Sequence, residues 1–193
     1  MARRLLRAGV ADSKTIKTER KILDLADLIR KEAAGRFNVI ALVPETYNRL
    51  YASIGNLNRL LAWGHAKTLE NVLEKVPSCP RAISDQFAQS AMTVRNALQS
   101  RGRQIQLEQH PKAEADVAVA AASILARAEF VRRMKELEEK AGMPLPKGAG
   151  PEVLKTARLL ARQGGEELLA KFAKMHFKTA TEALEMGDQT TRI

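Results

Sequence analysis

Short apolar runs alternate with longer segments of helical periodicity along this chain. Residues 18–34 place apolar side chains at helical spacing, and Gly35 follows them as a helix-ending residue. Residues 37–43 are then mostly apolar and are bounded by Gly35 and Pro44, which is typical of a strand buried on both faces of a parallel sheet. Two further strands are predicted, at 81–87 and 104–109. Because helices separate these strands, right-handed crossovers and a parallel α/β sheet are expected.

The other segments are predicted to be a loop and several helices. Residues 44–55 are expected to form a loop, or a loop with one helical turn, that holds Tyr47 and Tyr51. Asn56 is expected to cap a helix that runs to about Lys75. The inward-facing positions of that helix are predicted to be Leu57, Leu60, Leu61, Leu69, Val72 and Leu73. Further helices are predicted at 91–100, 114–141, 151–162, 166–173 and 179–186, and the stretch 144–150, rich in Pro and Gly, separates two of them.

Composition excludes several classes of protein. The single Cys79 excludes a disulfide scaffold and a cysteine-based zinc site. No run of about 18 apolar residues is present, so no membrane partner is expected. The basic start of the chain is not followed by the apolar segment of a secretory signal, and we expect a cytoplasmic protein. The net charge of +10 favours a polyanionic partner such as a nucleic acid.

Two carboxylates lie at the ends of predicted strands. Asp85 is near the end of the second strand, and Glu114 follows the third at the start of a helix. Ligands of parallel sheets bind outside the carboxyl ends of the strands, so we expect both acids at one rim. Such carboxylates can hold Mg²⁺ or Mn²⁺, and a pair of these ions can hydrolyse a phosphodiester. On spacing alone, the simpler and more frequent alternative is that Asp85 accepts backbone hydrogen bonds and Glu114 caps a helix.

Eight motifs carry a resemblance to a known family. They are VADSK at 10–14, PETYN at 44–48, NLNRLLAWGHAK at 56–67, DQFA at 85–88, KAE at 112–114, AAASILAR at 120–127, LPKGA at 145–149 and AKMHFK at 173–178. Together they resemble bacterial ribonuclease HIII, of the type 2 ribonuclease H group. The resemblance implies a ribonuclease H-like fold with mainly parallel strands flanked by helices. It also implies cleavage of the RNA strand of RNA–DNA hybrids with Mg²⁺ or Mn²⁺, leaving 5′-phosphomonoesters.

The resemblance assigns the third and fourth acids of the family's metal site to Asp85 and Glu114. Asp116 is the alternative to Glu114, although helical periodicity places it on a different face. Candidates for substrate contacts are Lys14, Lys147, Lys174, His176 and Lys178. For each lysine the alternative is a solvated side chain. His65 is expected to be a packing or hydrogen-bonding residue, with a substrate contact as the alternative. His110 is expected to lie in a surface loop, with proton transfer or a phosphate contact as the alternative.

The family's first two acids belong to a Gly-x-Asp-Glu-x-Gly-Lys-Gly segment, which this sequence does not contain. We therefore expect an N-terminally truncated member, in which 1–193 is a single partial catalytic domain that lacks the family's first strands. A preceding segment or a separate chain would supply two further acids. The competing hypothesis is a non-catalytic fragment that binds nucleic acid. Because an apolar strand at 37–43 would have an unpaired edge, we also expect low solubility or association.

Overall fold

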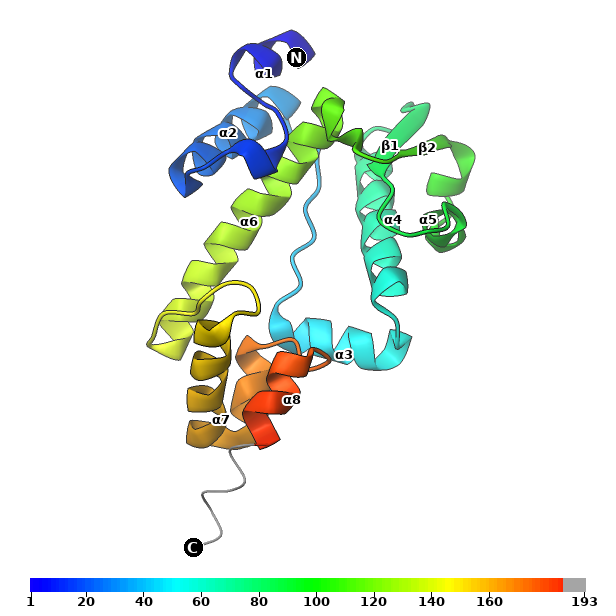
Figure 1. The fold of residues 1–193 in the computed structure, drawn as a ribbon. Helices are drawn as coiled ribbons and strands as arrows, with labels where there is room; N and C mark the ends of the chain where they lie inside the picture. Colours follow the sequence, from blue (N-terminus) through cyan, green and yellow to red (C-terminus); the bar gives the residue numbers. More distant parts are fainter. Residues whose placement is uncertain (186–193) are drawn as a thin grey trace, which may run out of the picture. The chain divides into compact units, whose positions relative to one another are not determined.

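The computed structural model describes residues 1–185, which form two compact units (Figure 1). The first unit contains 1–41 and 56–131, and the second contains 42–55 and the residues from 132 onward. The single catalytic domain predicted for 1–193 stays a prediction. No helix within the described part of the chain combines the length and apolar character needed to cross a membrane.

The first unit contains the sheet and most of the helices. Its elements are α1 (Ala2–Arg7), η1 (Ser13–Thr15), α2 (Glu19–Ala33), α4 (Leu57–Lys75), β1 (Arg81–Asp85), α5 (Met92–Ala97), η2 (Gly102–Gln104), β2 (Gln106–His110), η3 (Ala113–Ala115) and the first part of α6 (Val117–Ala141). The predicted helix cap is present, because Asn56 Oδ1 accepts a hydrogen bond from the Arg59 backbone N–H at 3.0 Å. Of the predicted inward positions in α4, Leu60 and Leu73 are buried, whereas Leu61 is exposed.

The two strands pair in parallel, as the helix–strand alternation predicts. Asp85 lies opposite His110 in the register, so both strands end at the same edge. Side chains of α4, β2, α5 and the residue that follows α5 form a core cluster; its buried members are Ala62, Ala66, Val94, Leu98 and Leu107.

The strand predicted at 37–43 is wrong. This segment has no regular secondary structure, and β1 and β2 are the only strands within residues 1–185. A strand is held by ladder hydrogen bonds to a neighbour, and no described segment supplies them to 37–43. Its side chains still contribute to packing, because Phe37 and Val39 contact the core between α2 and α6.

The alanine-rich first part of α6 packs against α2 in this core. Ile22 of α2 and Ile124 of α6 are fully buried in it. Ala120, Ala121 and Ala128 are also buried, and their small side chains allow close packing between the two helices. Each fully buried isoleucine contributes about 1.5–3 kcal/mol relative to an exposed one.

The second unit is helical and corrects another prediction. Residues 44–55, predicted as a loop or a loop with one helical turn, instead form the helix α3 (Pro44–Ile54) over nearly their whole length. Pro44 occupies the first helical position, where its fixed φ fits and no N–H is needed, and Gly55 ends the helix with φ 68°. The remaining helices of this unit are α7 (Pro151–Phe172) and α8 (Lys178–Glu185).

The two helices predicted within α7 meet at a break in the helical backbone. Gly164 and Gly165 are non-helical, and Gly165 has φ 63° with ψ −155°, a conformation that is essentially restricted to glycine. The last residue of the predicted 179–186 helix, Met186, lies outside the described residues.

Candidate active site

Asp85 and Glu114 lie at the edge where both strands end. Asp85 is the last residue of β1, and Glu114 lies in η3, four residues after β2 ends. The carboxylate Oδ1 of Asp85 accepts a hydrogen bond from the Ala113 backbone N–H at 3.3 Å. This bond ties Asp85 directly to the turn that carries Glu114. The structure therefore places both acids at the edge that the sequence indicates, while their role as metal ligands stays a prediction.

The local backbone decides which nearby acid caps the helix. The sequence places the helix start at Glu114, but α6 begins at Val117. Asp116 Oδ1 accepts a hydrogen bond from the Ala118 backbone N–H at 2.7 Å, as an N-cap residue does. Asp116 thus has the capping role that spacing alone gave to Glu114. The carboxylate of Glu114 instead lines a pocket beside the turn.

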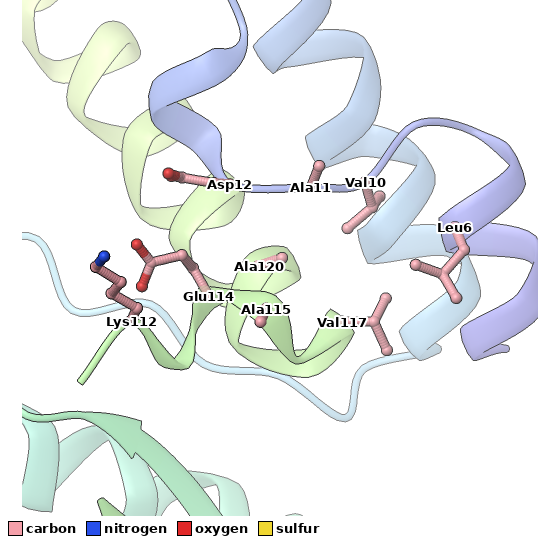
Figure 2. A pocket seen from close by; sticks show the side chains of 9 residues that line it. All are labelled: Leu6, Val10, Ala11, Asp12, Lys112, Glu114, Ala115, Val117 and Ala120. Carbon is pink, nitrogen blue, oxygen red and sulfur yellow. The ribbon is translucent and has the colours of Figure 1, made fainter. Parts of the chain in front are cut away.

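This pocket has a volume of about 400 Å³ and a polar end (Figure 2). The carboxylates of Asp12 and Glu114 and the amino group of Lys112 group at that end, away from Leu6, Val10 and Val117. Asp12 Oδ1 also accepts a hydrogen bond from the Lys14 backbone N–H at 2.9 Å. Sequence reasoning did not select Asp12 or Lys112 as site residues. The only available signal was that each lies in a motif that carries the resemblance.

Lys14 is the one predicted substrate-binding residue in the first unit. Its Nζ lies 4.0 Å from Glu114 Oε1, and its side chain is 82% exposed. An exposed pair at this distance contributes little to stability. The lysine is therefore available to an anion at the polar end of the pocket.

His65 packs against the strand that carries Asp85. Its Nδ1 lies 3.4 Å from Ser84 Oγ, and its ring centroid is 4.9 Å from that of Phe87. Burial lowers the pKa of His65, and the nearby charge of Asp85 opposes that shift. The residue as a whole is exposed, so its ring packs on Phe87 at the surface rather than in the core. His110 is exposed at the end of β2, with Nε2 3.5 Å from Glu108 Oε2.

The other substrate-binding candidates lie in the second unit. Lys147 is exposed in the segment between α6 and α7. Lys178 begins α8 and forms an ion pair of 3.1 Å with Glu182. Lys174 Nζ lies 4.6 Å from the ring centroid of Tyr47, and burial lowers its pKa.

His176 is held in a stack of rings. Its ring centroid lies 4.0 Å from those of Tyr51 and Phe177. Both ring nitrogens are buried and have no hydrogen-bond partner within residues 1–185. Burial lowers the pKa of His176, and the positive charge of Lys174 lowers it further. The predicted contact between His176 and substrate stays a prediction.

Asn48 fixes the segment that carries these residues. Its side-chain Nδ2 donates to the carbonyl oxygens of Ala170 and Ala173, at 3.1 and 2.9 Å. Its Oδ1 accepts from the Met175 backbone N–H at 2.9 Å. One side chain from α3 therefore supplies three hydrogen bonds to the chain around 170–175.

The donor set at the strand ends suits a hard divalent cation. Within residues 1–185 no group of three or more His, Cys, Asp or Glu side chains is arranged to hold a metal ion. However, Mg²⁺ is commonly bound by one or two protein carboxylates, with waters and substrate phosphate oxygens completing its coordination. Asp85 and Glu114 supply such carboxylates, so the residues present fit an ion shared with a phosphate.

Known proteins match this chain over most of its length. The family model described as Ribonuclease HII matches residues 1–180. Ribonuclease HIII of Chlamydia pneumoniae is 49% identical over 180 residues, covering 93% of this chain and 59% of that protein. Ribonuclease HIII of Chlamydia felis is 40% identical over 178 residues, covering 92% of this chain and 58% of that protein. The chain thus spans about three fifths of the length of these relatives.

Solved structures agree with the sequence matches. A crystal structure of Bst-RNase HIII in complex with Mn²⁺ matches with a TM-score of 0.83 and 30% identity, covering 97% of this chain and 61% of that one. Aquifex aeolicus RNase H3 matches with a TM-score of 0.66 and 25% identity, covering 91% of this chain and 61% of that one. The predicted ribonuclease H-like α/β fold and the family resemblance are confirmed: the chain belongs to the ribonuclease HII family.

Proposed function

We propose that this protein hydrolyses the RNA strand of RNA–DNA hybrids with two divalent ions, Mg²⁺ or Mn²⁺, and leaves 5′-phosphomonoesters. The observation that carries the proposal is the hydrogen bond between Asp85 and the turn of Glu114, which holds two carboxylates at one edge of the sheet. Family membership supports the reaction class, and the Mn²⁺ complex of the related Bst-RNase HIII supports the choice of ion.

The two carboxylates would hold the metal in this reaction. Bound divalent ions activate a water and stabilise the leaving oxygen in such hydrolyses. Asp85 is held by the Ala113 N–H, so one of its oxygens has a fixed direction. Glu114 follows Ala113 in the same turn, and Lys14 beside it would reduce the repulsion between the acids and a phosphodiester.

The positive charge of the chain supports a polyanionic substrate. Lys14 in the first unit and Lys147, Lys174, His176 and Lys178 in the second are the proposed contacts with the hybrid. Nucleic-acid backbones bind such cations by releasing condensed counterions, so we expect affinity to fall as salt rises. We further propose that both units belong to one catalytic domain and that the protein acts in the cytoplasm.

A second hypothesis is that this chain binds hybrids without cleaving them. It is favoured by one observation: the described residues bring no third metal-ligating side chain to Asp85 and Glu114. Binding would then depend on the lysines alone and would not require a divalent ion.

Hydrolysis of a hybrid labelled on its RNA strand, with Mg²⁺ or Mn²⁺, tests the proposal. We expect Asp85→Asn and Glu114→Gln each to lower the rate by at least about 100-fold, because each removes a metal-binding charge. Asp116→Asn is the matched control, since asparagine also caps helices and the rate should stay within about threefold. Digestion of the products by an exonuclease that requires a 5′-monophosphate identifies the 5′-phosphate. Binding without cleavage by the wild type would leave the second hypothesis standing.

A further inference from the structure

Lys112 adopts a backbone conformation that lysine does not favour. Its φ of 58° and ψ of 38° lie in the left-handed region. Ala34 is the only other non-glycine residue with positive φ in the described part of the chain. For a residue with a Cβ this conformation has an energetic cost, which glycine would avoid. A lysine at this position therefore needs a reason other than the backbone conformation, which glycine would adopt at lower cost.

The backbone of Lys112 builds the turn between the two acids. Its carbonyl oxygen accepts a hydrogen bond from the Ala115 N–H at 3.3 Å, which closes η3. The next residue, Ala113, donates its N–H to Asp85. Glycine could supply both bonds with less strain, so the backbone alone does not account for the side chain.

The side chain of Lys112 reaches the polar end of the pocket. Figure 2 shows its amino group on the same side as the carboxylates of Glu114 and Asp12. Glu114 has its ion pair with Lys14, and no described residue forms an ion pair with Lys112. An ammonium group without a partner, next to two acids, is suited to an anion that binds among them.

We propose that Lys112 binds a phosphate oxygen of the nucleic-acid backbone at the site of Asp85 and Glu114. This inference rests on the proposed function, because it takes the substrate to be a nucleic acid. The strained turn then has two roles. Its backbone holds Asp85, and its side chain holds the phosphate at a fixed place relative to both acids.

Two substitutions separate the charge from the backbone. Lys112→Gly removes the ammonium group and suits the left-handed conformation, so the turn is retained. Lys112→Arg keeps the charge with the same backbone preference as lysine. Ala34→Gly is the matched control for relief of strain, because Ala34 is also left-handed but ends α2. Thermal unfolding of all three variants should show that they fold.

The measurement is the affinity for a labelled RNA–DNA hybrid by fluorescence anisotropy in EDTA, over a range of salt concentrations. For Lys112→Gly we expect the affinity for the hybrid to fall about 10-fold at low salt. The plot of log affinity against log salt concentration should become shallower by about 0.9, the value for one phosphate contact. Lys112→Arg and Ala34→Gly should keep the wild-type slope.

An unchanged salt dependence of affinity for Lys112→Gly overturns the inference. A loss of affinity for Lys112→Arg as large as that for Lys112→Gly also overturns it, since the charge of residue 112 is then irrelevant to binding. Absence of hybrid binding by the wild type overturns both this inference and the proposed substrate. Binding by the wild type with the expected loss in Lys112→Gly, but with no cleavage in Mg²⁺ or Mn²⁺, supports Lys112 and refutes only the proposed hydrolysis.

Discussion

Glu70 of α4 is a buried acid whose removal should destabilise the chain leading into β2. The residue is 6% exposed. Its carboxylate accepts hydrogen bonds from Ser100 Oγ at 3.0 Å, from the Arg101 N–H at 2.9 Å and from the Gly102 N–H at 3.0 Å. Arg101 also forms an ion pair with it at 3.5 Å. This single carboxylate therefore holds the turn that precedes β2.

The cost of Glu70→Ala follows from these partners. The Gly102 N–H is buried, and leaving such a donor without an acceptor costs about 1–3 kcal/mol. The other two hydrogen bonds are half-buried and contribute about 1 kcal/mol each. We expect Glu70→Ala to lower the free energy of unfolding by about 3–5 kcal/mol. Glu70→Gln should lower it by about 2 kcal/mol, because its amide nitrogen faces backbone donors and cannot accept from them.

The pH dependence provides a second test of this carboxylate. Burial alone would raise the pKa of Glu70, but the hydrogen bonds from Arg101, Gly102 and Ser100 outweigh it and lower the pKa below its ordinary value of 4.5. The stabilisation is therefore complete above pH 4.5 and is lost as the pH falls through the lowered pKa of the folded state. The difference in the free energy of unfolding between the wild type and Glu70→Gln should accordingly become smaller as the pH falls below 4.5.

Urea denaturation followed by circular dichroism, at neutral pH and near pH 4, measures both effects. Glu74→Ala is the matched control, because Glu74 is exposed one turn further along α4 and should change stability by less than about 0.5 kcal/mol. A loss for Glu70→Ala no larger than that for Glu74→Ala would refute the reasoning.

Two further predictions concern the second unit. Asn48→Ala should lower the free energy of unfolding by about 3 kcal/mol, since three hydrogen bonds to the chain around 170–175 are lost. The same urea measurement applies, with the exposed Asn58→Ala as control, and equal stability of the two variants would contradict this role. His176 has a lowered pKa, so its unfolded state gains a proton first and stability falls as the pH drops below about 6.5. His176→Phe keeps the ring stack and should make that fall less steep; an identical pH profile would show that the pKa of His176 is the same in the folded and unfolded states, which contradicts the prediction.

Elements with their own local signals could be predicted from the sequence. The helix after Asn56 has a capping residue and a regular apolar stripe, so it was placed to within a residue. The segment 37–43 has the apolar composition of a buried strand but no other strand signal. A strand also needs a neighbouring strand to pair with, and the sequence pattern does not specify that neighbour. Residues 44–55 were misread because Pro44 and Gly55 resemble loop boundaries, although proline at the first position and glycine after the last are also the usual limits of a helix.

The candidate site divides in the same way. Asp85 and Glu114 could be selected because one lies near the end of a predicted strand and the other follows one, and the ends of parallel strands share an edge. Asp12 could not be placed with them from spacing, since it is the residue that caps η1, about a hundred residues earlier in the chain. Lys112 was missed because its left-handed backbone, which aims the side chain, has no signature in a run of ordinary residues.

The short turn that carries Glu114 has a mechanical consequence. Because Asp116 caps α6 separately, Glu114 lies outside α6 and can adjust its position without unwinding that helix. The packed residues of α6, such as Ile124, anchor only the helix that follows. The position of this acid therefore depends on a three-residue segment and one hydrogen bond to Asp85, and we expect the two acids to shift together when an ion or a phosphate binds to either of them.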